Sequence, residues 1–96
     1  MTIRVVLADD HVMFRDGLRL LFRAEGDIEI VGETSSSDEV LGQVQAKVAD
    51  VLVLGLTMPG GLSGPQVVEA VRANRPRLRI VVLTMYEDTY HVCEMF

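Results

Sequence analysis

Short, mostly apolar stretches lie at residues 3–8, 28–31, 51–54 and 78–83, and the stretch at 51–54 is apolar throughout. Continuous apolarity without alternation is typical of strands that are covered on both faces of a sheet. The first and last stretches are also rich in valine and isoleucine, which favour strands. The pattern therefore predicts four strands.

The segments between these strands carry helical signals. Phe14, Leu18 and Phe22 recur at helical spacing after the first strand. Residues 35–38 offer N-cap side chains for a second helix, and Pro65 suits the first turn of a third. The chain from residue 87 to residue 96 is predicted to begin a fourth helix. Strand and helix alternate with short connections, so the predicted fold class is α/β, a parallel sheet with helices on both faces.

Composition narrows the class of protein. At 96 residues the chain makes one domain at most, and its 49% hydrophobic content supports a core. A net charge of −5 without a Lys/Arg cluster argues against a nucleic-acid surface within these residues. No apolar run is long enough for a membrane span, and no signal peptide is evident. The single cysteine, Cys93, suits a reduced compartment, so we expect a cytoplasmic protein.

Two acidic residues, Asp9 and Asp10, directly follow the first strand. Adjacent carboxylates there suit a hard divalent cation such as Mg²⁺. The alternative is that one acid caps the first helix while the other is solvated. His11 and His91 lie in different segments without a cysteine pair, so we expect solvated or capping histidines rather than metal ligands.

Several motifs together resemble one family. They are "VVLADDH" on the first strand, "FRDGLRLLF" on the first helix, "ADVLVLGLTMPGGLSG" on the third strand and its turn, and "IVVLTMY" on the fourth strand. This order and spacing is similar to the receiver domain of bacterial two-component response regulators. It most resembles the subgroup whose receiver precedes a LuxR-type helix-turn-helix output domain. The resemblance implies a flavodoxin-like (CheY-like) sheet with strand order 2-1-3-4-5.

The resemblance also implies roles for individual residues. In the family, an aspartate at the end of the third strand takes a phosphoryl group from a histidine kinase. Asp9 and Asp10 match the acidic pair that supports Mg²⁺, with Asp10 the more direct ligand, and the backbone carbonyl of Thr57 matches a further ligand. Thr84 matches the hydroxyl that turns toward the phosphoryl group. The parent of such a receiver is implied to be a DNA-binding transcriptional regulator.

The chain departs from the family pattern at the acceptor, where Gly55 aligns with the phosphorylated aspartate. Glycine has no carboxylate oxygen to act as the nucleophile. The metal site also loses a ligand, so we expect weak Mg²⁺ binding. The turn that follows holds one additional glycine, Gly60 or Gly61, which a surface loop can tolerate.

The chain also ends at Phe96, before the fifth strand, lysine and fifth helix of a full receiver, and without an output domain. Residues 1–96 are therefore interpreted as an incomplete receiver-like domain. We expect it to be phosphorylation-incompetent, not an enzyme, and to act through protein–protein contacts, its histidine kinase partner being non-productive. One alternative is an engineered or fragment receiver without independent activity. Another is a receiver that uses a non-standard acceptor, such as Asp10 or Thr57.

Self-association is expected for the same reason. Without a fifth strand and helix, the edge of residues 78–83 would be unpaired, and Phe14, Leu18 and Phe22 would lose part of their cover. An apolar edge strand and a large apolar patch both favour pairing with another chain. The sequence therefore predicts a homo-oligomer.

Overall fold

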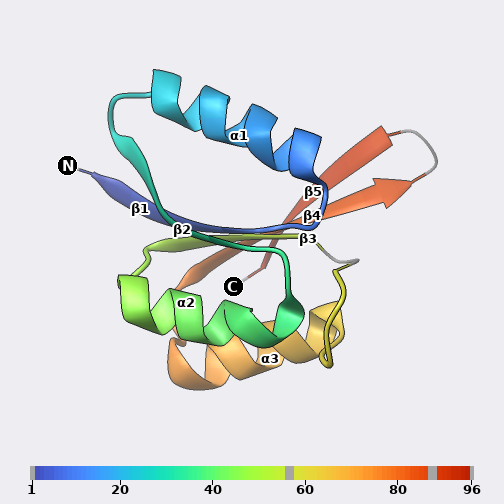
Figure 1. The fold of residues 1–96 in the computed structure, drawn as a ribbon. Coiled ribbons are helices and arrows are strands. Elements are labelled where there is room, and N and C mark those ends of the chain that lie inside the picture. The colour runs from blue at the N-terminus through green and yellow to red at the C-terminus, as the bar shows by residue number, and fades with distance from the viewer. Residues whose placement is uncertain (1, 56–57, 87–88, 96) are drawn as a thin grey trace.

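The computed structural model describes residues 2–55, 58–86 and 89–95, and only the backbone at 84–86 and 89–95. Its sheet has the order β2-β1-β3-β4-β5 (Figure 1). The strands are β1 (Ile3–Ala8), β2 (Ile28–Thr34), β3 (Val51–Gly55), β4 (Arg79–Tyr86) and β5 (Thr89–Met95). The first four are parallel to one another, as predicted.

Helices cover both faces of the sheet, which confirms the predicted fold class. Helix α1 (Val12–Ala24) lies on one face, and α2 (Val40–Lys47) and α3 (Gly64–Asn74) lie on the other (Figure 1). A 3-10 turn, η1 (Ser37–Glu39), precedes α2. Among the described residues, none of the helices has the length and apolarity that a membrane crossing requires.

The start of α3 follows from its sequence. The Ser63 side chain accepts a hydrogen bond from the backbone N–H of Gln66, and the Gln66 side chain accepts one from the N–H of Ser63. This reciprocal pair satisfies two of the N–H groups that a helix start leaves without partners. Pro65 occupies the first turn, as predicted, because its missing N–H costs nothing there.

The buried residues form two clusters, one on each face of the sheet. The larger lies under α2 and α3 and consists of Val6, Ala8, Val40, Val44, Ala49, Leu52, Leu54, Val67, Val71, Leu78, Ile80 and Val82. The smaller lies under α1 and consists of Val5, Leu7, Val53 and Leu83, with Phe14, Leu18 and Phe22 of α1 half-buried against it.

The fourth helix predicted from residue 87 onward is wrong, because residues 89–95 form strand β5, antiparallel to β4. Thr89, Tyr90 and Val92 belong to the β-branched and aromatic residues that favour strands. The backbone groups along β4 also need partners, which a helix would not provide. The prediction that the edge of residues 78–83 is unpaired is therefore wrong as well.

Candidate functional site

The carboxyl ends of β1 and β3 lie side by side. Ala8, the last residue of β1, pairs with Leu54, the residue before the end of β3. Asp9 follows β1 and Gly55 ends β3, so the parallel register brings these two predicted site residues to the same edge of the sheet. In an open parallel sheet, that edge is where ligands gather.

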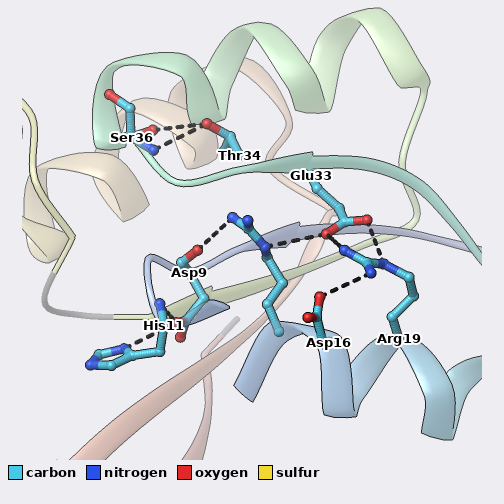
Figure 2. A network of polar contacts seen from close by, with 8 residues as sticks. Asp9, His11, Asp16, Arg19, Glu33, Thr34 and Ser36 are labelled. Carbon is cyan, nitrogen blue, oxygen red and sulfur yellow. Dashed lines mark hydrogen bonds and ion pairs between the residues drawn. The ribbon is translucent and has the colours of Figure 1, made fainter. Parts of the chain in front are cut away.

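Asp9 is buried, with 2% of its surface exposed, and hydrogen bonds hold it on several sides. Its Oδ1 accepts a 2.6 Å bond from the backbone N–H of His11 and lies 3.1 Å from His11 Nδ1 (Figure 2). The backbone N–H of Asp9 donates to the carbonyl of Thr34 at 3.1 Å. The backbone carbonyl of Asp9 accepts a hydrogen bond from Arg15 Nη1 at 2.9 Å. These bonds fix both the backbone and the carboxylate of Asp9.

Asp10 is half-buried, and together with Asp9 and His11 it forms a cluster of three side chains that can ligate a metal ion. Its Oδ1 lies 3.2 Å from His11 Nδ1, is itself buried, and has no hydrogen-bond partner. One ligand atom each from Asp9, Asp10 and His11 lies within 4.8 Å of the others. A buried carboxylate oxygen without a donor is stabilised by a cation, and paired carboxylates suit Mg²⁺. The two acidic residues therefore fit a divalent cation, and Asp10 Oδ1, which accepts no hydrogen bond, is suited to be one of its ligands.

His11 was expected to be a solvated or capping residue. It does stand at the N-cap position of α1, but its side chain makes no capping bond. Its ring faces the carboxylates of Asp9 and Asp10 instead. The sequence gives a weak signal of this contact, since His11 directly follows the two acids.

Gly55 lies beside the side chain of Asp9. A Cβ added to Gly55 would lie 2.5 Å from Asp9 Oδ2 and 3.2 Å from Asp9 Cγ, so a side chain at residue 55 requires the Asp9 carboxylate to shift.

Two further predicted residues are placed less fully. Thr57 lies outside the described residues. Thr84 follows Leu83, the residue of β4 that pairs with Gly55, so its backbone stands at the same edge of the sheet. The side chain of Thr84 is outside the description.

Residues of η1 hold the loop after β3, a contact that the sequence did not reveal. The backbone N–H of Ser37 donates to the carbonyl of Pro59 at 2.9 Å, and its side chain accepts from the N–H of Leu62 at 3.1 Å. Asp38 accepts from the N–H of Gly61 at 2.9 Å. Gly60 has a φ of 133°, which favours glycine. The sequence of residues 35–38 predicts helix-capping side chains. Their bonds to the loop after β3 form only because that loop folds back onto η1.

A network of ion pairs joins α1 to β2 beside the site (Figure 2). Arg19 donates to both carboxylate oxygens of Glu33, at 2.7 and 2.9 Å, and also to Asp16 at 2.9 Å. Arg15 Nε lies 3.3 Å from Glu33 Oε1, while its Nη1 reaches the carbonyl of Asp9. The hydrogen bond from Arg19 lowers the pKa of Glu33, and the same bond raises the pKa of Arg19. Arg15 therefore connects this network to the acidic cluster.

The family model of the response regulator receiver domain matches residues 5–96 of this chain. The chain belongs to the response regulator receiver family. This confirms the resemblance that the motifs indicated. Receiver domains bind Mg²⁺ at an acidic pocket, and Asp9, Asp10 and His11 form an acidic cluster in this structure.

Individual relatives of this receiver are regulatory proteins. The chain is 37% identical over 89 residues to the uncharacterized transcriptional regulatory protein YhcZ of Bacillus subtilis, covering 93% of this chain and 41% of YhcZ. It is 33% identical to the oxygen regulatory protein NreC of Staphylococcus haemolyticus, covering 88% of this chain and 39% of NreC. The chain thus spans about two fifths of the length of these relatives.

Solved receiver structures superpose on this one. The receiver domain of NarL from Mycobacterium tuberculosis has a TM-score of 0.81 at 32% identity, covering 91% of this chain and 69% of that chain. The non-phosphorylated receiver of RcsB from Escherichia coli has a TM-score of 0.84 at 29% identity, covering 91% and 68%. This receiver is thus of the NarL and LuxR type.

Proposed function

We propose that this receiver does not accept a phosphoryl group and acts through protein–protein contacts. The observation that carries the proposal is Gly55, which ends β3 with the carboxylate of Asp9 packed against it. An acyl phosphate forms only on a carboxylate oxygen, and residue 55 offers none. Asp9 is buried and its Oδ1 is already hydrogen-bonded to the N–H of His11, which makes it a poor substitute nucleophile.

The acidic cluster is proposed to bind Mg²⁺ weakly. Asp9 and Asp10 would hold the cation, and the backbone carbonyl of Thr57 would be a third protein ligand. A bound cation neutralises the repulsion between adjacent carboxylates. Because Gly55 contributes no oxygen, we expect a dissociation constant in the millimolar range, about 4 kcal/mol of binding free energy at a 1 M standard state.

The proposed partners follow from the family. Receiver domains interact with histidine kinases, and here such an encounter would transfer no phosphoryl group. Within the proposed receiver-like domain, residues 1–96, Thr84 would be the switch hydroxyl, with no phosphoryl group to meet. The parent is proposed to be a cytoplasmic, DNA-binding transcriptional regulator and not an enzyme. RcsB, a structural relative, has been solved as dimers bound to DNA, which supports a homo-oligomer here.

Incubation with acetyl phosphate and Mg²⁺ tests the proposal. Intact-mass spectrometry should detect no hydroxylamine-labile phosphoryl adduct, because residue 55, at the end of β3, offers no carboxylate. The RcsB receiver, treated in parallel, is the control for the reagents. A stoichiometric gain of one phosphoryl group would contradict the proposal, and its location on Asp10 would support the alternative acceptor instead.

A further inference from the structure

Helix α1 carries a second stripe of residues, on its solvent side, besides the one that packs on the sheet. The stripe consists of Met13, Gly17, Leu20 and Ala24, all of them exposed, and Met13 and Leu20 are 88% and 67% exposed. Their spacing of four, three and four residues aligns them along one side of the helix, in the a/d pattern of a coiled coil. We call these four residues the α1 seam.

We infer that two copies of this chain pair through the α1 seam, with the two helices antiparallel and related by two-fold symmetry. The inference names a surface for the proposed homo-oligomer and rests on that part of the proposed function. A two-fold pair sets the same patch of each copy against itself, so the patch must be complementary to its own copy. The α1 seam meets this condition in both size and charge.

The size of the side chains alternates along the α1 seam. It reads large, small, large, small from Met13 to Ala24. The antiparallel register that sets Leu20 against the partner's Gly17 also sets Met13 against the partner's Ala24. Each large side chain then fills the space above a small one, which is how facing layers of a core interdigitate.

Gly17 serves this pairing better than it serves the single chain. A Cβ on Gly17 would meet nothing within 4 Å, so no close contact inside the chain requires a glycine there. Glycine in the middle of a helix is also destabilising relative to alanine. The missing side chain instead leaves room above the helix for the partner's Leu20.

Opposite charges lie along one flank of the α1 seam. Asp16 and Arg23 are seven residues apart, which places both on the same side of the helix. Asp16 has a side chain that is 51% exposed, and only its Oδ1 accepts the bond from Arg19. Arg23 is exposed and forms no ion pair among the described residues. Antiparallel pairing brings this flank against itself, so Asp16 of each copy meets the partner's Arg23.

The pairing is expected to be weak, because one pair of short helices buries less area than a standard interface. We expect a dissociation constant of about 100 μM. Sedimentation at concentrations below and above this value measures it. Denaturation experiments at low micromolar concentration then report on the single chain.

Gly17→Ala separates the pairing from the stability of the helix, because the two effects have opposite signs. A methyl group beneath the partner's Leu20 should raise the dissociation constant of the dimer about tenfold by overpacking. In the single chain, alanine should raise the midpoint of urea denaturation. Gly42→Ala on α2 is the matched control, since a Cβ there also meets nothing within 4 Å. It should raise the midpoint and leave the dissociation constant unchanged.

A mixing experiment tests the charged flank. Asp16→Arg makes the flank wholly positive, and Arg23→Asp makes it wholly negative. Each variant alone should dimerise about tenfold more weakly than the wild type, because like charges then meet. An equimolar mixture of the two should form heterodimers at least as tightly as the wild type forms homodimers, as native mass spectrometry would detect.

Far-UV circular dichroism at low micromolar concentration checks that each variant folds. If a charge variant does not fold, the comparison of Gly17→Ala with Gly42→Ala decides. A dimer whose dissociation constant is the same in Gly17→Ala and in the wild type would overturn the inference, and the homo-oligomer would then form through another surface. A wild type that stays monomeric well above the expected constant would overturn the inference and the homo-oligomer together. The acetyl phosphate experiment tests the missing acceptor separately from both.

Discussion

The two faces of the sheet differ in how completely they are covered. On the face of α2 and α3, the larger cluster holds most of the fully buried side chains, including Val44 of α2 and Val71 of α3. On the other face, α1 has no buried residue. Its Met13, Leu20 and Leu21 are 88%, 67% and 66% exposed.

This difference shows how each helix is held. Helices α2 and α3 are attached by apolar burial, which is worth about 25 cal/mol for each Å² removed from water. Helix α1 combines half-buried Phe14, Leu18 and Phe22 with the ion pairs from Arg15 and Arg19 to Glu33. The acidic cluster lies at the end of β1, between the two faces, and α1 begins directly after it. The more loosely packed helix is therefore the one connected to the site.

The largest expected effect is a paired truncation that compares the two faces. Leu52→Ala, in the fully buried cluster under α2 and α3, should cost about 2–5 kcal/mol of unfolding free energy because it leaves a cavity. Leu18→Ala, half-buried on α1, should cost about 1–2 kcal/mol because less area leaves water. Urea denaturation measures both values.

Leu20→Ala is the control for this pair, since Leu20 is exposed on the same helix as Leu18. It should change the unfolding free energy by no more than about 0.5 kcal/mol. Equal costs for Leu52→Ala and Leu18→Ala would show that the two faces contribute alike, against this account.

A smaller effect is expected at the ion pairs of α1. Glu33→Gln should cost no more than about 1 kcal/mol near neutral pH, since partly exposed pairs contribute little. The pKa of Glu33 is lowered in the folded state by the hydrogen bond from Arg19, so its stabilisation is present above the ordinary value of 4.5 and is lost as the pH falls through the folded pKa. The difference between wild type and Glu33→Gln should therefore vanish in acid, as urea denaturation at several pH values would show. A difference that grows as the pH falls would contradict the assignment.

Much of the fold could be predicted because strands and helices leave periodic patterns. The mostly apolar run at 3–8 coincides with β1, and the continuous run at 51–54 lies within β3. Pro65 lies in the first turn of α3. Residues 89–95 could not be assigned by pattern alone, because their strand depends on pairing with β4. Long-range backbone pairing has no local signature.

In the candidate site, too, local motifs predict some features and long-range contacts decide the others. Asp9, Asp10 and Gly55 could be selected from the motifs, and the register of β1 and β3 brings Asp9 and Gly55 together. The bonds from Ser37 to the loop after β3 could not be selected, because the partners are more than twenty residues apart. The closeness of Asp9 Oδ2 to the place that a Cβ on Gly55 would take could not be selected either, because it depends on a side-chain rotamer.

The central claim is that the carboxyl end of β3 offers no acceptor, and an NMR titration of the backbone amides tests it most directly. Mg²⁺ alone should shift the amides of Asp10 and His11 with a midpoint in the millimolar range. Subsequent addition of the phosphomimetic beryllofluoride should shift no further amides, because it has no carboxylate at residue 55 to bind. Saturable, beryllofluoride-dependent shifts at Gly55 and its partner Leu83 would contradict the account.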